Sequence, residues 1–453
     1  MSAKVVGQGP DRLGRRKAMG QSSKASRRFT AAGILTVLIA IGALLSGCGA
    51  PQPAGRAAPH AEVGAGGAAV VPPMPVVSGS PLESASPAPA LTPTAGVAPV
   101  VLPPIRAAHL VTPTIGWALT DRGLRLTTTG GATWATVTPP GVPAARILGA
   151  AFLDAAHGWT VVAGNPDGTQ RTGLDLLRSA DGGRSWQQAT LAGPDRLYTE
   201  APSEAATIDF LDAQHGWIAI RLASSSNFSR GRLFQTTDGG ATWQQRTTPI
   251  GDPVRFVTPT DGWAAGGPGG GHLYVSHDGG QSWQASTVAA PSAFAKSAVT
   301  YSLPTFTDPQ TGVLPVTFAG DDATPPGLGF YQTRDGGGSW TLAQVITLDG
   351  RLGVGVAART AVFGPAAWLV ARPGASRLTA TADGGHSTQE VTSAGLLPNI
   401  ADLTFADAAN GWARAADIEC PGAPQVTKGG CRSTPIQLLR TSDGGRTWVP
   451  LIP

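Results

Sequence analysis

One eight-residue motif recurs seven times in this chain and constrains its fold more than any other feature. The final copy is TSDGGRTW, which ends at Trp448 and combines an aspartate with two glycines and a tryptophan. Between 40 and 60 residues separate the aspartate positions of successive copies. Repetition at this spacing indicates one supersecondary unit copied seven times. The other copies are TTTGGATW from Thr127, SADGGRSW from Ser179, TTDGGATW from Thr236, SHDGGQSW from Ser276, TRDGGGSW from Thr333 and TADGGHST from Thr381.

A second motif, ending in Gly-Trp, precedes each copy of the first. The two motifs together give fourteen tryptophan positions in seven repeats. All twelve tryptophans of the chain lie at these positions, and only Val313 and Thr388 depart from the pattern. The second motif is FLDAAHGW ending at Trp159, FLDAQHGW at Trp217, FVTPTDGW at Trp263 and FADAANGW at Trp412, with looser versions ending at Trp117, Val313 and Trp368.

Each repeat has the pattern of four short strands. In the second repeat these are ILGAAFL, GWTVVAG, LDLLRSA and WQQATLA, which are apolar, partly alternating and separated by turn residues. Helical periodicity is not evident after residue 47. A four-stranded unit cannot bury both of its faces alone, so radial packing of seven units is the natural solution. The sequence therefore predicts an all-β fold, a seven-bladed β-propeller of four-stranded antiparallel blades, over residues 105–453.

The first 47 residues have the layout of an export signal. A basic region from Lys4 to Arg28 precedes the apolar run Phe29–Leu45, and Leu45-Ser46-Gly47-Cys48 follows. This ending resembles the lipobox of bacterial lipoproteins, which implies that Cys48 becomes the lipidated first residue at the extracytoplasmic face of the cell membrane. An uncleaved membrane anchor with an incidental cysteine is the alternative. The route of export stays open.

Residues 48–104 are rich in alanine, proline and glycine and predict a flexible spacer, because they offer too little apolar surface to offset the entropy of ordering. The whole chain has 33 basic and 29 acidic residues, a net charge of +4. Without residues 1–47 the balance becomes 25 against 28, or −3. The exported part therefore gives no electrostatic reason to expect a nucleic-acid partner.

Two cysteines remain, Cys420 and Cys431. In an exported chain their spacing favours a disulfide that closes one loop, and the alternative is a pair of free thiols. Two ligands are too few for a structural zinc site.

The aspartate motif resembles the Asp-box of bacterial neuraminidase-type repeats. Together with the upstream Gly-Trp motif it resembles the propellers of the photosystem II assembly and stability factor family, over about residues 105–453. The resemblance is specific for the fold but only weakly specific for function, because propellers of this kind include sialidases, other glycoside hydrolases, sorting receptors and non-catalytic assembly factors.

The repeated aspartate is expected to be structural, since a catalytic carboxylate need occur only once or twice. We expect it to accept hydrogen bonds from turn amides one and two residues further on, while the glycines supply positive φ and the tryptophan packs between blades. The residues given this role are Asp181, Asp238, Asp278, Asp335, Asp383 and Asp443, with Trp134, Trp186, Trp243, Trp283, Trp340 and Trp448. Thr129 replaces the aspartate in the first repeat.

A binding site is expected on the face opposite these motifs. The distance from the Gly-Trp position to the aspartate position varies between 12 and 31 residues, whereas the turns of the aspartate face hardly vary. Candidates on the variable loops are Tyr198, Glu200, Glu204, Arg230, Tyr301, Asp321 and Asp322. Candidates for the central channel are Arg146, Asp209, Arg255 and Asp402. None is predicted to be catalytic.

The leading functional hypothesis is a membrane-tethered, non-catalytic propeller that binds or helps to assemble a protein or envelope component, without a cofactor. The alternative is a glycoside hydrolase of sialidase type, in which Tyr198 near Glu200 is the only candidate nucleophile. The Phe/Tyr-Arg-Ile-Pro motif of sialidases is absent. A metal site is not expected, because the histidines are dispersed and His157 and His215 occupy a repeated turn position.

Overall fold

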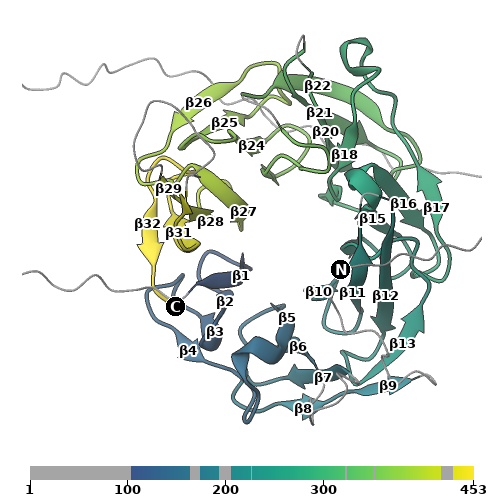
Figure 1. The fold of residues 1–453 in the computed structure, drawn as a ribbon. Coiled ribbons are helices and arrows are strands. Elements are labelled where there is room, and N and C mark those ends of the chain that lie inside the picture. The colour runs from purple at the N-terminus through teal and green to yellow at the C-terminus, as the bar shows by residue number, and fades with distance from the viewer. Residues whose placement is uncertain are drawn as a thin grey trace, which may run out of the picture. The chain divides into compact units, whose positions relative to one another are not determined.

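The computed structural model describes residues 104–163, 174–192, 206–225, 227–321, 324–349, 352–419 and 432–453, all within the compact unit Thr94–Pro453. This unit is a ring of seven blades around a central channel, and the chain passes once around the ring (Figure 1). The predicted fold class is confirmed. In the described part of the chain, no helix is long and apolar enough to cross a membrane.

The blades follow one another in chain order, and each blade runs from an inner to an outer strand. Blades 1 to 3 are β1 (Ile105–Leu110), β2 (Gly116–Thr120), β3 (Gly123–Thr127) and β4 (Ala135–Thr136); β5 (Ile147–Phe152), β6 (Gly158–Ala163), β7 (Leu174–Ser179) and β8 (Gln187–Gln188); β10 (Ala206–Phe210), β11 (Gly216–Ser224), β12 (Ser229–Thr236) and β13 (Thr242–Arg246). Blades 4 and 5 are β14 (Val254–Phe256), β15 (Gly262–Gly266), β16 (His272–Ser276) and β17 (Gln284–Ser286); β18 (Val299–Tyr301), β19 (Thr305–Phe306), β20 (Gly312–Phe318), β21 (Gly327–Thr333) and β22 (Thr341–Thr347). Blades 6 and 7 are β23 (Thr360–Val362), β24 (Trp368–Ala371), β25 (Arg377–Thr381) and β26 (Gln389–Thr392); β27 (Asn399–Phe405), β28 (Gly411–Ala416), β31 (Gln437–Thr441) and β32 (Val449–Leu451).

Three short strands are added to this arrangement of four-stranded blades. Strand β9 (Thr190–Ala192) follows blade 2 but pairs in parallel with β13, the outer strand of blade 3. Strands β29 (Ile418–Glu419) and β30 (Arg432–Ser433) form a short hairpin between β28 and β31. Cys420 and Cys431 lie outside the described residues, so their pairing stays a prediction.

Aromatic side chains join neighbouring blades in a repeated triad. In the contact between blades 3 and 4, the Trp217 ring stacks on Phe256 with centroids 3.8 Å apart, and Trp283 meets the Phe256 ring edge-on at 5.9 Å. The Gly-Trp motif of one blade thus covers the inner-strand phenylalanine of the next blade, which also contacts the box tryptophan of its own blade. Aromatic pairs in such geometries contribute energy beyond their buried area.

The Gly-Trp motif has no room for a side chain at its glycine. A Cβ on Gly262 would lie 2.4 Å from Phe256 Cδ1, and a Cβ on Gly216 would lie 2.5 Å from Phe210 Cε1. Neither glycine has a positive φ. The motif therefore requires glycine because the phenylalanine ring of the same blade lies directly over its Cα.

The ring closes by side-chain packing between blades 7 and 1. Trp412 from β28, Leu438 from β31 and Leu451 from β32 pack in one buried cluster with Leu110 from β1. The Ile105 amide donates to the Ile436 carbonyl across this seam at 3.4 Å. The first and last described strands belong to different blades, so no blade is completed by strands from both ends of the described chain.

Candidate functional site

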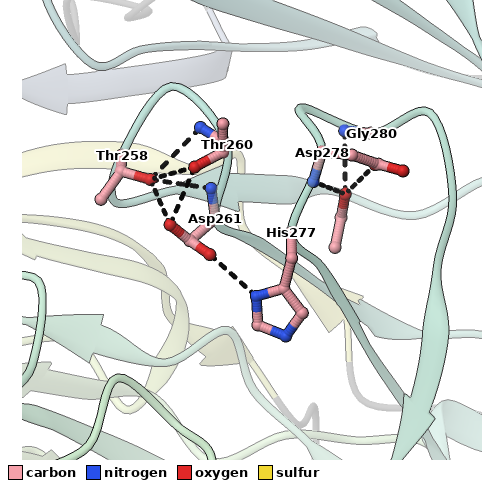
Figure 2. Close-up of polar contacts among 7 residues, drawn as sticks. Thr258, Thr260, Asp261, His277, Asp278 and Gly280 are labelled. Carbon is pink, nitrogen blue, oxygen red and sulfur yellow. Dashed lines mark hydrogen bonds and ion pairs between the residues drawn. The ribbon is translucent and has the colours of Figure 1, made fainter. Parts of the chain in front are cut away.

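The Asp-box motifs lie at the turns between the third and fourth strands of each blade. Figure 2 shows the copy in blade 4, where the Ser276 hydroxyl accepts the amides of Asp278 and Gly280. One oxygen of Asp278 accepts the Ser282 amide at 2.9 Å, and the other accepts the Ser282 hydroxyl at 2.5 Å. The expectation of bonds one and two residues on was wrong, because the carboxylate spans the whole turn and bonds the residue four positions on.

The boxes also form hydrogen bonds with the turn between the first two strands of their own blade. The amide of the first box glycine donates to a carbonyl of that turn in all seven blades, at 2.7 to 2.9 Å. In blade 4 the Asp261 carboxylate of the turn also lies 2.8 Å from Nδ1 of His277 in the box (Figure 2). In blades 2 and 3, His157 and His215 bond the turn aspartates Asp154 and Asp212. The polar groups of this face therefore bond mainly to one another.

These bonds make the propeller sensitive to acid. Hydrogen bonds from Ser282 lower the pKa of Asp278 to about 2, and the corresponding serines do the same for Asp181 and Asp335. A carboxylate whose pKa is lower in the folded chain stabilises it above the unfolded pKa of about 4, and this stabilisation is lost as the pH falls towards 2. We expect the urea midpoint to stay level from pH 7 to about 4.5 and then to fall steeply.

The matched variant is Asp278→Asn. It should unfold earlier than the parent chain at pH 7, and its midpoint should fall less between pH 4 and pH 2.5, because one titrating group is gone. An identical pH dependence in the two chains would show that the box carboxylates do not contribute to acid sensitivity.

A cavity of about 860 Å³ opens on the opposite face, at the mouth of the channel. Among the described residues, its lining comes from loops and from first and second strands of blades 3 to 7 and includes no Asp-box residue. Its walls include hydroxyl groups, the glycine-rich loop at 266–270 and the segment 354–360, which connects blade 5 to blade 6. This is the face on which the sequence predicts variable loops.

The buried carboxylate of Asp252 stabilises one wall of the cavity through hydrogen bonds. Asp252, 8% exposed, accepts the guanidinium of Arg221, the Ser229 hydroxyl at 2.7 Å and the Gly267 amide at 2.9 Å. These partners come from blades 3 and 4, so the carboxylate fixes the two blades at the cavity rim. A buried charge with three donors is a satisfied structural group.

The loop candidates do not gather at one point. Tyr301 lines the cavity, but its hydroxyl accepts the Val288 amide and its ring is buried. Arg230 lies over the Phe228 ring on the outer side of blade 3, and Asp321 caps the Thr324 amide in a turn. Tyr198, Glu200, Glu204 and Asp322 lie outside the described residues.

Three of the four channel candidates come together. Asp209, Arg255 and Asp402 lie on the inner strands of blades 3, 4 and 7 and act electrostatically on one another or on the same neighbours. Arg146 does not join them. Its guanidinium bonds the Ala163 carbonyl at 2.8 Å, at the end of β6.

Three further residues of this group were not predicted from the sequence. They are His109 on β1, Arg359 just before β23 and Arg414 on β28. The signal for His109 was its register, since it pairs with Trp117 as Asp209 pairs with Trp217 and Arg255 with Trp263. We call the six residues His109, Asp209, Arg255, Arg359, Asp402 and Arg414 the channel cluster.

The channel changes the proton affinities of this cluster. His109 is exposed to the channel interior, but surrounding protein lowers its pKa, Arg255 lowers it further and Asp402 opposes the change. Burial raises the pKa of Asp209, against the effects of Arg255 and the Phe256 amide. Burial and Arg359 lower the pKa of Arg414, which Asp402 raises. Perturbed groups gathered in a cleft are typical of functional sites.

Comparisons with known proteins agree with the repeat architecture. A family model described as BNR/Asp-box repeat matches residues 274–285. No curated protein matches the sequence. Among solved structures, the chain is similar to YCF48 bound to D1 peptide (17% identity, 67% of this chain and 80% of that one, TM-score 0.36). It is also similar to YCF48 from Cyanidioschyzon merolae (17%, 67% and 84%, 0.38) and to the GH74 xyloglucanase from Xanthomonas campestris (15%, 77% and 68%, 0.48). These proteins differ in what their names say they bind or act on.

Proposed function

We propose that this chain is an exported, lipid-anchored propeller that binds a segment of a protein partner in the cavity on its loop face. The observation that carries the proposal is the division between the two faces. The Asp-box face bonds mainly to itself, whereas the opposite face is hollowed by a cavity that three members of the channel cluster line. Binding residues commonly lie on loops that a rigid scaffold positions.

The lining of the cavity favours a protein segment over a sugar or a small aromatic ligand. Pockets for small ligands are mostly lined by apolar and aromatic side chains. Among the described residues that line the cavity, Tyr301 is the only aromatic one, and it is buried. All twelve tryptophans belong to the repeated blade motifs. Backbone and hydroxyl groups, which suit an extended peptide, make up much of the wall.

Site-specific photocrosslinking from native membranes tests the proposal. Val354, at the cavity rim, is 65% exposed, and Val449, on the outer strand β32, is 55% exposed. A photoreactive amino acid at Val354 is expected to capture a protein partner, and the same group at Val449 is expected to capture none. Equal capture at both positions would contradict the assignment of the binding face.

Two controls separate tethering and catalysis from binding. A Cys48→Ala chain should leave the membrane fraction, because it lacks the proposed lipid attachment. Turnover of aryl glycosides that disappears in Tyr198→Phe would replace the proposal by the glycoside hydrolase alternative.

A further inference from the structure

The channel cluster brings together three arginines that have no bonded partner among the described residues. Several arginines elsewhere are held by the protein, as Arg106 is by the Ala144 and Ile147 carbonyls at 2.8 Å. Across the described residues, no hydrogen bond or ion pair engages the guanidinium groups of Arg255, Arg359 or Arg414. The Nε atom of Arg414 is buried without a hydrogen-bond partner.

The acidic members of the cluster do not neutralise these arginines by contact. Asp402 accepts the amide of Leu403 at 2.9 Å, and Asp209 accepts the amide of Phe256 at 3.3 Å. Neither aspartate forms an ion pair with an arginine in the described part of the chain. The cluster therefore has three formal positive charges and two formal negative charges, with the aspartates bonded to backbone.

Arg255 and Arg414 are partly buried and so lose part of their hydration, a loss that a partner normally offsets, whereas Arg359 is exposed. Arg359 and Arg414 also repel each other, since each carries a positive charge in the same confined space. An anion placed between the arginines would supply the missing partner. The planar guanidinium matches the oxygen pairs of carboxylate and phosphate groups.

The cavity gives such an anion a route to the arginines. Arg255, Arg359 and Asp402 line its walls, and Arg414 lies behind Asp402 in an adjoining small pocket. We propose that the channel binds a small ligand through an oxyanion group, a carboxylate or a phosphate, held by Arg255 and Arg359 with Arg414 behind them. The site lies in the same cavity in which we propose that a protein segment binds, but inorganic probes test it without that partner.

Titration calorimetry on the full purified chain tests this site, with inorganic phosphate, citrate and the uncharged citramide as probes. We expect saturable binding of phosphate or citrate, and none of citramide. Arg255→Gln and Arg359→Gln should each weaken binding by about tenfold or more, because each removes a charge-assisted bond. Binding of phosphate alone or of citrate alone would identify the ligand's chemistry.

Two further variants separate this site from general charge effects. Asp402→Asn should tighten anion binding several-fold, since it removes a negative charge while its side-chain oxygen can still accept the Leu403 amide. Arg178→Gln, on β7 outside the cluster, should leave binding unchanged. The proposal is overturned if neither probe binds, if Asp402→Asn does not tighten binding, or if Arg178→Gln weakens it as much as Arg255→Gln. Circular dichroism of each variant verifies that it folds.

Discussion

A chain carrying Gly262→Ala is expected to unfold about 2 to 3 kcal/mol more easily than the parent, although the change adds one methyl group. The added Cβ would lie 2.4 Å from both Cδ1 and Cε1 of Phe256. Real Cβ atoms do not approach ring carbons this closely, so the phenylalanine must move. Urea unfolding followed by tryptophan fluorescence measures the loss.

The Phe256 ring has no room to move. Trp217, which is fully buried, stacks on one face of the ring, and Trp283 lies against its edge. The Trp217 indole is also fixed, because its N–H donates to the Gly279 carbonyl at 3.2 Å. Moving the phenylalanine therefore disturbs the contact between blades 3 and 4 as well as the fold of blade 4.

Gly353→Ala is the matched control. Gly353 also has no positive φ, but the nearest atom to its added Cβ would be Val356 Cγ2 at 3.6 Å, an ordinary contact. This variant should keep the parent's stability within about 0.5 kcal/mol. Equal losses in the two variants would mean that general glycine effects, and not the crowded aromatic ring, decide the cost.

The chain already contains one blade in which alanine occupies this motif position. In blade 6 the residue before Trp368 is Ala367, and Phe363 lies edge-on to Phe405 of blade 7 at 5.7 Å. Trp368 turns towards blade 5, where it stacks on Phe330 at 4.0 Å. Val313, which lacks the tryptophan in blade 5, lies in this same buried cluster, and Thr388 belongs to the blade 6 box, whose Gly385 lies against Gln344 of blade 5. The exceptions to the sequence pattern therefore describe one rebuilt interface.

The sequence predicts the blades well because their signals are local. Each box, each Gly-Trp motif and each short strand is encoded within a few residues, and repetition makes the count secure. Only part of the aromatic triad could be predicted from the sequence. The phenylalanine stands in the motif FVTPTDGW, but its stacking partner Trp217 belongs to the preceding repeat, about 40 residues earlier in the sequence.

The channel cluster was harder to predict for a related reason. Its six members come from blades 1, 3, 4, 6 and 7 and do not share one residue type. Only His109, Asp209 and Arg255 share a sequence position, eight residues before the tryptophan of the Gly-Trp motif. What all six share is a place on or beside the inner strands, which only the closed ring brings together. Arg146 shows the limit of the sequence argument, because it stands close to the start of an inner strand and still bonds the end of β6.

The seam between blades 7 and 1 should be the most vulnerable contact of the ring, and Leu451→Asp is expected to destabilise the chain by about 3 kcal/mol or more. Leu451 is 7% exposed and packs against Gly131 in the first box, where an added Cβ would lie 2.6 Å from its Cδ1. A carboxylate there would be buried without a partner. No stretch of chain connects the facing edges of these two blades directly, whereas consecutive blades are joined by a connecting segment.

Val449→Asp places the same charge two residues away on the same strand. Val449 is 55% exposed, so its replacement should change the free energy of unfolding by less than about 0.5 kcal/mol. Hydrogen exchange locates the damage: Leu451→Asp should speed exchange in β1 and β28, on both sides of the seam, before it does so in blades 3 and 4. Exchange that rises equally in every blade would mean that the ring unfolds as one cooperative unit, and that packing at the seam is no weaker than elsewhere.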